Sequence, residues 1–280
     1  MEFIDKIKVK LLHYTWYIAY GHYDESIIAQ GIDVSKLHIV KNPYKEKWFA
    51  DPFILEDNEN NIKFLVEEFD KSVGRGRIAR ITVDKEKDVI TDCNIVLEEQ
   101  THLSFPAIYR MEGKIYVHPE NYASGKSYIY EYDRNSDRLI NKKLLSEHPL
   151  TDAIIVEVGN KFKLLSTLGT DPNGSELSVF SSDSFLGPYV EETKEFYPNK
   201  TARMAGYVIN TNEGLVRPAQ NCDGAYGKNV VFYKGKQGIG ALSPWWPYSG
   251  LHTFNTYGSS YVIDLKKYDY PLIYKMKNLV

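Results

Sequence analysis

The chain has little cysteine and no long apolar segment. Cys93 and Cys222 are its only cysteines, too few for a disulfide framework and without the spacing of a Cys–His zinc site. No apolar run approaches the roughly 18 residues that a membrane-spanning helix needs. Residues 1–10 carry charges of both signs, so they lack the apolar centre of a signal peptide. We therefore expect a cytoplasmic protein with no transmembrane segment.

Basic residues and several familiar motifs are also missing. The 34 Lys and Arg are outnumbered by 37 Asp and Glu, which gives a net charge of -3 and no footprint for nucleic acid. There is no phosphate-binding Gly-rich loop, no dinucleotide fingerprint and no Gly-x-Ser-x-Gly elbow. The Asp-x-Asp pair with which many nucleotide-sugar transferases hold a metal is absent too. We expect no cofactor, no metal and no nucleic-acid partner.

What the chain does contain is tyrosine, 22 residues of it, and an internal repeat. Each repeat has a polar or turn residue, a short apolar run, a tight turn, and a second β-rich run that ends in a polar residue. The repeats begin near five residues, Asp51, Phe105, Asp152, Ala205 and His252. Steps of roughly 50 residues, with no long amphipathic helical pattern, are typical of propeller blades. The sequence predicts an all-β fold, a five-bladed β-propeller that forms a single domain over residues 1–280.

The pattern also predicts how the propeller closes and where its polar residues lie. The segment Trp16–Tyr20 precedes the first repeat, and we expect it to supply the strand that closes the last blade. In an antiparallel hairpin, the start of the first strand and the end of the second lie at the same edge. Starts and ends should therefore share one mouth of the central channel: Asp51, Asp152 and His252 as starts, and Glu68, Glu120, Thr167 and Gln220 as ends.

Five stretches of the chain also resemble a known family. They are residues 48–53, 64–70, 76–79, 217–221 and 250–255. In this order they resemble the N-terminal domain of plant glucosamine inositolphosphorylceramide transferases and its bacterial relatives. That resemblance implies a role in building surface polysaccharides or glycoconjugates, although the plant proteins carry a separate glycosyltransferase domain C-terminal to this one.

The Asp-Pro pair at the start of the first repeat gives a more distant resemblance, to the five-bladed enzymes of glycoside hydrolase family 43. That family uses an Asp as base at this place, a second Asp that tunes acidity, and a Glu as acid. The resemblance implies that Asp51 is the base, whereas by itself an Asp before a proline is often only a turn residue.

Four acids are the catalytic candidates: Asp51, Asp152, Glu120 and Glu68. A cluster of carboxylates at one mouth pushes their pKa values apart, which separates an acid from a base. Which residue takes which role is left open by the sequence.

The candidates for substrate binding are His102, His252, Arg203, Arg217, Gln220, Asp223 and Tyr226. The two arginines could hold a phosphate through paired donors, or they could pair with an acid or cover a surface. Each histidine could equally be a hydrogen-bonded structural residue. Trp245 and Trp246 could form a platform for a sugar ring or a packed corner.

Three classes of function follow from these residues. The first is a glycosyltransferase that moves a sugar, such as a furanose or a phosphopentose, from an activated phosphate donor to a glycan or lipid-linked acceptor. The second is a hydrolase of the family 43 type, and the third is a carbohydrate-binding propeller without catalysis. We favour the first, because the family resemblance points to synthesis and the carboxylate cluster points to catalysis.

Overall fold

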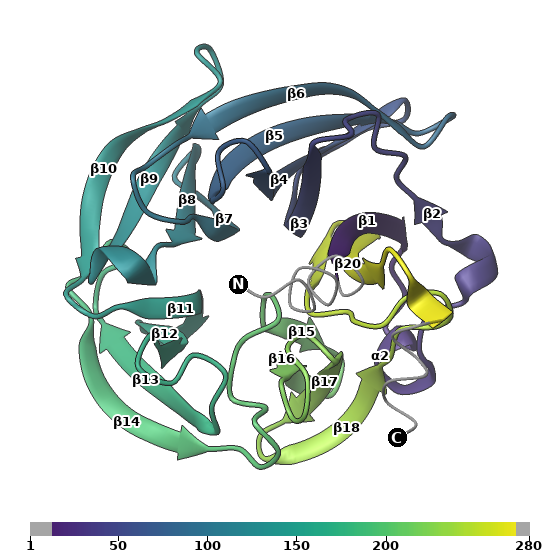
Figure 1. Cartoon of the computed structure of the whole chain (residues 1–280). Helices are drawn as coiled ribbons and strands as arrows, with labels where there is room; N and C mark the ends of the chain where they lie inside the picture. Colours follow the sequence, from purple (N-terminus) through teal and green to yellow (C-terminus); the bar gives the residue numbers. More distant parts are fainter. Residues whose placement is uncertain (1–12, 273–280) are drawn as a thin grey trace, which may run out of the picture.

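The computed structural model describes residues 13–272, which form five antiparallel four-stranded sheets around a central axis (Figure 1). The predicted five-bladed propeller is confirmed. The first blade is formed by β3 (Lys47–Asp57), β4 (Asn61–Asp70), β5 (Gly76–Asp84) and β6 (Val89–Leu97). The second is formed by β7 (Ser104–Met111), β8 (Lys114–Glu120), β9 (Ser127–Asp133) and β10 (Arg138–Ser146).

The next two blades have the same order, with the first strand next to the axis and the fourth on the outside (Figure 1). The third is formed by β11 (Leu150–Val158), β12 (Lys161–Leu168), β13 (Glu176–Ser182) and β14 (Val190–Phe196). The fourth is formed by β15 (Ile209–Thr211), β16 (Gly214–Asn221), β17 (Asn229–Lys234) and β18 (Gln237–Leu242).

The fifth blade joins the two ends of the described chain. Its inner strands are β19 (Phe254–Tyr257) and β20 (Ser260–Tyr268), and its outer strands are β1 (Tyr14–His22) and β2 (His38–Ile39). Strand β1 pairs with β20 along its whole length, from Tyr14 opposite Tyr268 to His22 opposite Ser260. The expected closure is therefore confirmed, and the structure adds that the N-terminal segment supplies two strands of this blade.

Between residues 13 and 270, helix is confined to three short segments: α2 (Ile27–Gln30), η1 (Val34–Lys36) and η2 (Tyr122–Ser124). None of the helices in the described part of the chain has the length and apolar character that crossing a bilayer requires.

Burial follows the position of each strand in its blade. The inner strand β3 is buried from Phe49 to Leu55, because neighbouring blades cover both of its faces. Phe53 and Phe105 of adjacent inner strands are fully buried and meet edge to face with ring centres 4.9 Å apart. The outer strand β14 is instead exposed along most of its length and carries charges, which protect a sheet edge from pairing with another chain.

Side chains bridge the inner strands below the mouth of the channel. The backbone N–H of Ile108 donates to the Tyr207 hydroxyl at 2.7 Å, which connects the second blade with the fourth. The N–H of Ile155 donates to the Tyr109 hydroxyl at 2.8 Å. Because the second and fourth blades are not neighbours, Tyr207 must cross the channel.

Three inner strands carry the same backbone irregularity near this mouth. Asp51, Phe105 and Asp152 have φ values of 49°, 44° and 46°, in the left-handed region. At each of them the pairing with the next strand shifts register. Such a β-bulge re-aims a side chain, and bulges are common beside active sites. The same β-bulge thus occurs in three blades, and two of the re-aimed residues are aspartates.

Candidate active site

A cavity of about 880 Å³ lies at the mouth of the channel. Its polar lining comes from the bulge of β3, the ends of β4 and β8, and the loops before β7, β15 and β19. Its lining residues are His13, Tyr14, Trp16, Trp48, Asp51, Glu67, Phe69, His102, Ser104, Glu120, Tyr122, Ala123, Arg203, Tyr226 and His252. Acids, histidines and aromatic rings are thus mixed in one recess, a composition suited to a polar ligand with ring faces.

Many of the predicted site residues meet at this cavity. Those that line it are Asp51, His102, Glu120, Arg203, Tyr226 and His252. Asp152 and Gln220 lie one layer behind the lining and are 1% and 0% exposed. Asp152 accepts a hydrogen bond from the cavity-lining Arg203 and another from Gln220.

Glu68 is a correction to the expected site. It is fully buried between Lys47 and Arg77, whose side-chain nitrogens lie 2.8 and 2.9 Å from its carboxylate. Its neighbour Glu67 lines the cavity instead. Successive residues of a strand point to opposite faces, so the pairing of Glu67 with Ala50 decides which acid reaches the mouth. The sequence shows two adjacent acids and cannot give that register.

Two further predicted residues lie outside the cavity. Arg217 is buried, donates to the backbone carbonyls of Thr201 and Ala202, and packs on the ring of Tyr197 with its guanidinium carbon 3.8 Å from the ring centre. It therefore ties a loop to its own blade and is not placed to hold a phosphate. Asp223 is exposed in a turn, where its N–H donates to Asn221 Oδ1 at 3.0 Å.

The Trp245 and Trp246 pair does not line the cavity either. Trp245 packs on Tyr248 with ring centres 5.6 Å apart, which corresponds to the packed-corner alternative. The aromatic rings that do face the cavity include Trp16, stacked on His252 at 4.1 Å, and Trp48, stacked on Phe69 at 4.8 Å. Trp48 could have been noticed, because it stands three residues before Asp51 in a stretch that carries the family resemblance.

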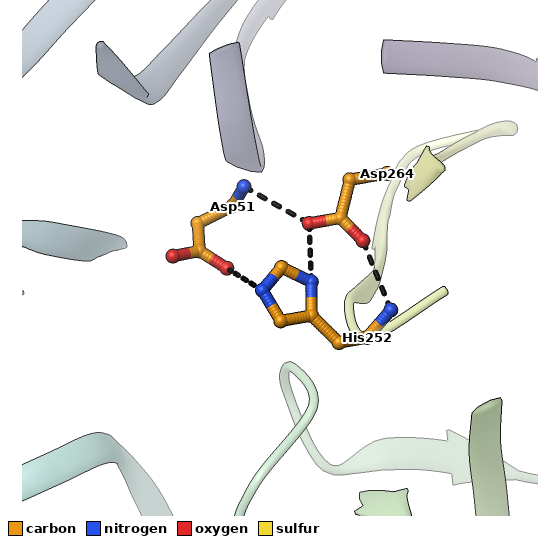
Figure 2. Close-up of side chains that lie close together, drawn as sticks. All are labelled: Asp51, His252 and Asp264. Atoms are coloured by element: carbon orange, nitrogen blue, oxygen red, sulfur yellow. Dashed lines mark hydrogen bonds and ion pairs between the residues drawn. The ribbon is translucent and has the colours of Figure 1, made fainter. Parts of the chain in front are cut away.

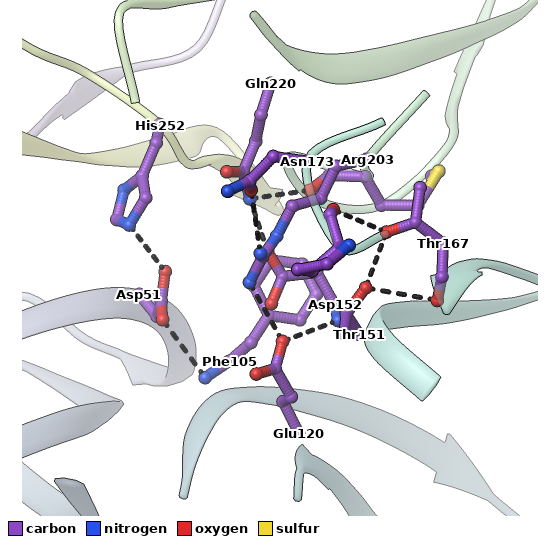
Figure 3. A network of polar contacts seen from close by, with 12 residues as sticks. Asp51, Phe105, Glu120, Thr151, Asp152, Thr167, Asn173, Arg203, Gln220 and His252 are labelled. Atoms are coloured by element: carbon purple, nitrogen blue, oxygen red, sulfur yellow. Dashed lines mark hydrogen bonds and ion pairs between the residues drawn. The ribbon is translucent and has the colours of Figure 1, made fainter. Parts of the chain in front are cut away.

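One half of the polar network centres on Arg203, as Figure 3 shows. Its Nε donates to Asp152 Oδ2 at 2.6 Å, and its Nη2 donates to Glu120 Oε2 at 2.9 Å. Its Nη1 donates to Asn173 Oδ1 at 3.0 Å. The same Glu120 oxygen accepts the backbone N–H of Asp152 at 3.0 Å. Arg203 therefore lines the cavity with each of its three nitrogens already hydrogen-bonded.

The two acids beside Arg203 are pushed in opposite directions. Burial raises the pKa of Asp152, but the charge of Arg203 and the hydrogen bond with Glu120 outweigh burial and leave that pKa lowered. Burial also raises the pKa of Glu120, and here the Arg203 charge does not compensate, so the pKa stays well above its usual range. The two acids that share the arginine therefore have pKa values shifted in opposite directions, which is the separation that acid–base chemistry needs.

The other half of the network joins Asp51, His252 and Asp264 (Figure 2). Asp264 Oδ2 lies 2.6 Å from His252 Nδ1, and His252 Nε2 lies 3.5 Å from Asp51 Oδ1. Burial, followed by the charges of Asp152, Glu67 and Asp264, raises the pKa of Asp51 well above its usual range. Asp264, which lies within β20, was not among the predicted residues.

At the edge of the cavity, His102 is held in a fixed orientation. Its Nδ1 accepts the backbone N–H of Gly76 at 2.9 Å, and its Nε2 lies 3.1 Å from Glu67 Oε1. An acceptor at Nδ1 implies that the proton of the neutral ring is on Nε2, where it is donated to Glu67. His102 thus orients a cavity-lining acid.

Asp51, His252 and Asp264 are also the group of side chains in the described residues whose atoms could surround a cation, since the relevant atoms lie within 4.8 Å of one another. Both Asp264 oxygens, however, accept backbone N–H groups, from Asp51 on one side and from His252 and Thr253 on the other. This bonding indicates that Asp264 orients His252. We assign no metal to the site.

Comparison with known proteins agrees with the sequence motifs. Residues 33–238 match the family described as glucosamine inositolphosphorylceramide transferase 1, N-terminal. The chain belongs to this family. A rice protein named glucosamine inositolphosphorylceramide transferase 1 is 28% identical over 199 residues, which cover 68% of this chain and 26% of the rice protein. The chain therefore spans about a quarter of the curated relative that it matches.

Solved structures share the propeller fold at low identity. An α-L-arabinofuranosidase from Podospora anserina, solved in complex with cellotriose, superposes with a TM-score of 0.56 at 12% identity, covering 78% of this chain and 80% of that one. A thermostable family-43 glycoside hydrolase has a TM-score of 0.49 at 12% identity, covering 70% of this chain and 75% of the other.

The family match includes only part of the cavity. Asp51, Glu67, Glu120 and Arg203 lie within residues 33–238, whereas His252 and Asp264 lie beyond them. Members of this family can thus be compared directly at the carboxylates of the first two blades, while the fifth blade's contribution rests on the present structure.

Proposed function

We propose that the propeller is a glycosyltransferase that binds a saccharide acceptor in the cavity and transfers to it a sugar from an activated phosphate donor. The observation that carries this proposal is the position of Asp51. Its side chain faces the cavity from a bulge, and Oδ1 has no partner among the described residues closer than His252 Nε2 at 3.5 Å. An unshared carboxylate oxygen beside bound hydroxyl groups can act as a general base.

In the proposed step, Asp51 takes the proton of an acceptor hydroxyl while that oxygen forms a bond to the sugar's anomeric carbon. The bond between this carbon and the leaving phosphate breaks, and its electron pair departs with the phosphate. A carboxylate with a raised pKa is a stronger base once it has lost its own proton. The cavity's aromatic rings, Trp48 and Trp16 among them, offer faces for sugar rings.

The names of the relatives support transfer over other reactions. The family and the rice protein are both described as transferases. Assembly of a cell-surface polysaccharide or glycoconjugate, with a furanose or a phosphopentose as the transferred sugar, is the finer form of this proposal.

Hydrolysis of a glycosidic bond is the second candidate, and one observation favours it. Glu120 faces the same cavity with a raised pKa, so it can hold the proton that a departing sugar hydroxyl requires. Arg203 is already bonded to Asp152, Glu120 and Asn173, which leaves it poorly placed for a diphosphate. A hydrolase needs no such cation.

A single panel of substrates separates the candidates. Nucleotide sugars and phosphoribosyl diphosphate are offered with glycan acceptors, and aryl furanosides and pyranosides are offered alone. Transfer predicts a glycosylated acceptor and released phosphate or diphosphate only when donor and acceptor are both present. Release of aryl alcohol without any transfer would move the assignment to hydrolysis. Saturable glycan binding without turnover of any substrate would move it to a binding module.

A further inference from the structure

The contacts of Asp264 bear on the protonation of His252, the side chain that faces Asp51. Asp264 is completely buried, and its oxygens accept the backbone N–H groups of Asp51 at 3.1 Å, His252 at 3.0 Å and Thr253 at 3.1 Å. Burial raises the pKa of Asp264, but the charge and hydrogen bonds of His252 and the N–H of Asp51 outweigh burial and leave it lowered. A carboxylate with several N–H donors is held ionised.

An ionised Asp264 also bears on which ring nitrogen of His252 carries the proton. Asp264 Oδ2 lies 2.6 Å from His252 Nδ1, and an ionised oxygen so close to a ring nitrogen favours the tautomer with its proton on Nδ1. The lone pair of the neutral ring is then on Nε2, which is directed toward Asp51 Oδ1. Trp16, stacked on the ring with nearly parallel planes, prevents the imidazole from turning away.

We propose that Asp51, His252 and Asp264 form a proton relay, in which Asp51 passes its own proton to His252 Nε2 and takes up the proton of the acceptor hydroxyl. This proposal rests on the proposed function and adds two residues to its mechanism. The proton of Asp51 moves to Nε2 and the hydroxyl proton replaces it on Asp51, while the new bond to the sugar forms and the leaving phosphate departs. Asp264 balances the charge of the resulting imidazolium, and water removes the proton after the product leaves.

The relay explains how Asp51 can act as a base in a cavity that is rich in acids. Asp51 is surrounded by acids from three other blade elements: Glu67 on β4, Asp152 on β11 and Asp264 on β20. Arg203 is the cation whose charge opposes them at Asp51, and Tyr226 and Trp16 enclose the histidine. Burial and these acids favour the protonated form of Asp51. A neighbouring imidazole that accepts this proton leaves Asp51 ionised when the acceptor binds.

The first test is the tautomer of His252 in the free protein, measured by ¹⁵N NMR on imidazole-labelled protein. A His252→Gln variant identifies the signal among the seven histidines. The relay predicts a protonated Nδ1, and an Nε2 that shares a proton with Asp51 and changes its shift in Asp51→Asn. A bare Nδ1 with a protonated Nε2 in the wild-type protein would overturn the proposal, whatever the enzyme is found to catalyse.

The second test is the pH profile of Asp264→Asn, with Asp183→Asn as the charge-matched control, because the Asp183 side chain is 89% exposed. An Asn at 264 no longer stabilises the imidazolium, so kcat should fall by about 10²-fold or more. The acid limb of the profile should move to lower pH, since Asp264 is one of the charges that raise the pKa of Asp51. The control should keep the wild-type profile.

The two tests fail in different ways. Absence of transfer with every donor would remove the proposed function, while the NMR measurement still decides whether the proton-sharing pair exists. A folded Asp264→Asn variant with the wild-type kcat at every pH would reject the relay and leave Asp51 as an unassisted base. The conservative substitution Asp264→Glu should restore the NMR signature if its carboxylate reaches Nδ1.

Discussion

Asp51 uses its backbone and its two carboxylate oxygens for different purposes. Its N–H donates to Asp264, its Oδ2 accepts the N–H of Phe105 at 3.2 Å, and its Oδ1 faces His252 in the cavity. The left-handed φ of 49° is less costly for Asp than for most residues, because its short polar side chain can bond locally. The residue thus joins the fifth, first and second blades through hydrogen bonds while one oxygen is left for chemistry.

Replacing Asp51 with Asn should abolish turnover, because Asn cannot accept a proton at neutral pH. A positioned base contributes about 10²- to 10⁴-fold, so kcat should fall by that factor. The raised pKa of Asp51 means that the folded protein loses stability relative to Asn as pH rises above the ordinary Asp range. The Tm of the variant relative to the wild type should therefore increase between pH 4 and pH 8. Full activity in the variant would identify Asp51 as a turn residue.

Arg203 is expected to be essential for stability, since it is the cation shared by Asp152 and Glu120. Arg203→Met should lower the free energy of unfolding by about 3–5 kcal/mol, because it leaves a buried charge without its partner. Asp152 has a lowered folded pKa, so its ion pair stabilises the protein above the ordinary Asp pKa and less as pH falls. Urea titrations should accordingly show a larger loss at pH 7 than at pH 4.

The matched control is Arg134→Met, which removes an ion pair with Glu56 whose arginine side chain is 59% exposed. Exposed pairs contribute only about 0–1 kcal/mol. Equal losses in the two variants would show that the Arg203 cluster is solvated and does not behave as a buried network.

At the scale of the strand, register decides which side chains reach the cavity. Glu67 and Glu68 differ by one position, yet one lines the recess and the other is enclosed by Lys47 and Arg77. A one-residue shift exchanges the two faces of a strand. Strand β5 also passes close to the loop before β7. Because Gly76 has no Cβ, it leaves room there for Leu103 and His102.

Gly76→Ala tests that approach. An added Cβ would lie 2.4 Å from the Leu103 carbonyl oxygen and 2.8 Å from Glu67 Oε1. We expect a loss of about 1–3 kcal/mol in urea unfolding, because backbone must move to relieve the clash. Gly238→Ala is the control, since its Cβ would meet nothing closer than 3.9 Å. That change should be neutral or stabilising by up to about 1 kcal/mol. A neutral Gly76→Ala would show that the loop before β7 is free to shift.

At the scale of the whole molecule, closure makes the blades depend on one another. β1 completes the fifth blade, and Ile18 on it packs in a cluster that contains Phe49 and Val66 of the first blade as well as Val262 of the fifth. The cavity-lining residues come from four of the blades, and Asp152 of the third blade lies one layer behind them. Loss of closure should therefore affect the site as well as the strand.

Ile18→Ala is expected to lower the stability of the entire propeller by about 2–5 kcal/mol. Far-UV circular dichroism and tryptophan fluorescence should report the same shifted urea midpoint with an unchanged slope, because the blades unfold together. Val34→Ala, at a side chain 43% exposed, should change stability by less than about 0.5 kcal/mol. Two separate transitions in Ile18→Ala would show that the fifth blade unfolds alone.

The sequence by itself determined the number of blades, the closing strand and much of the cavity lining. Repeated turns and apolar runs are local, so five repeat starts were sufficient to count blades and to bring Asp51, Glu120 and His252 to one mouth. Three of those starts, Asp51, Phe105 and Asp152, are also the positions of the β-bulges.

Only the tertiary structure decided which of two neighbouring acids lines the cavity and which side chains far apart in the chain pair with one another. Glu67 replaced Glu68 because register depends on pairing across the hairpin. Arg203 bonds to Asp152 and Glu120 of other blades, whereas Arg217 bonds to the loop before its own blade, and only the folded chain shows which partner each arginine has. Asp264 joined Asp51 for the same reason: 213 residues of chain separate them, and only the closure of the ring brings them into contact.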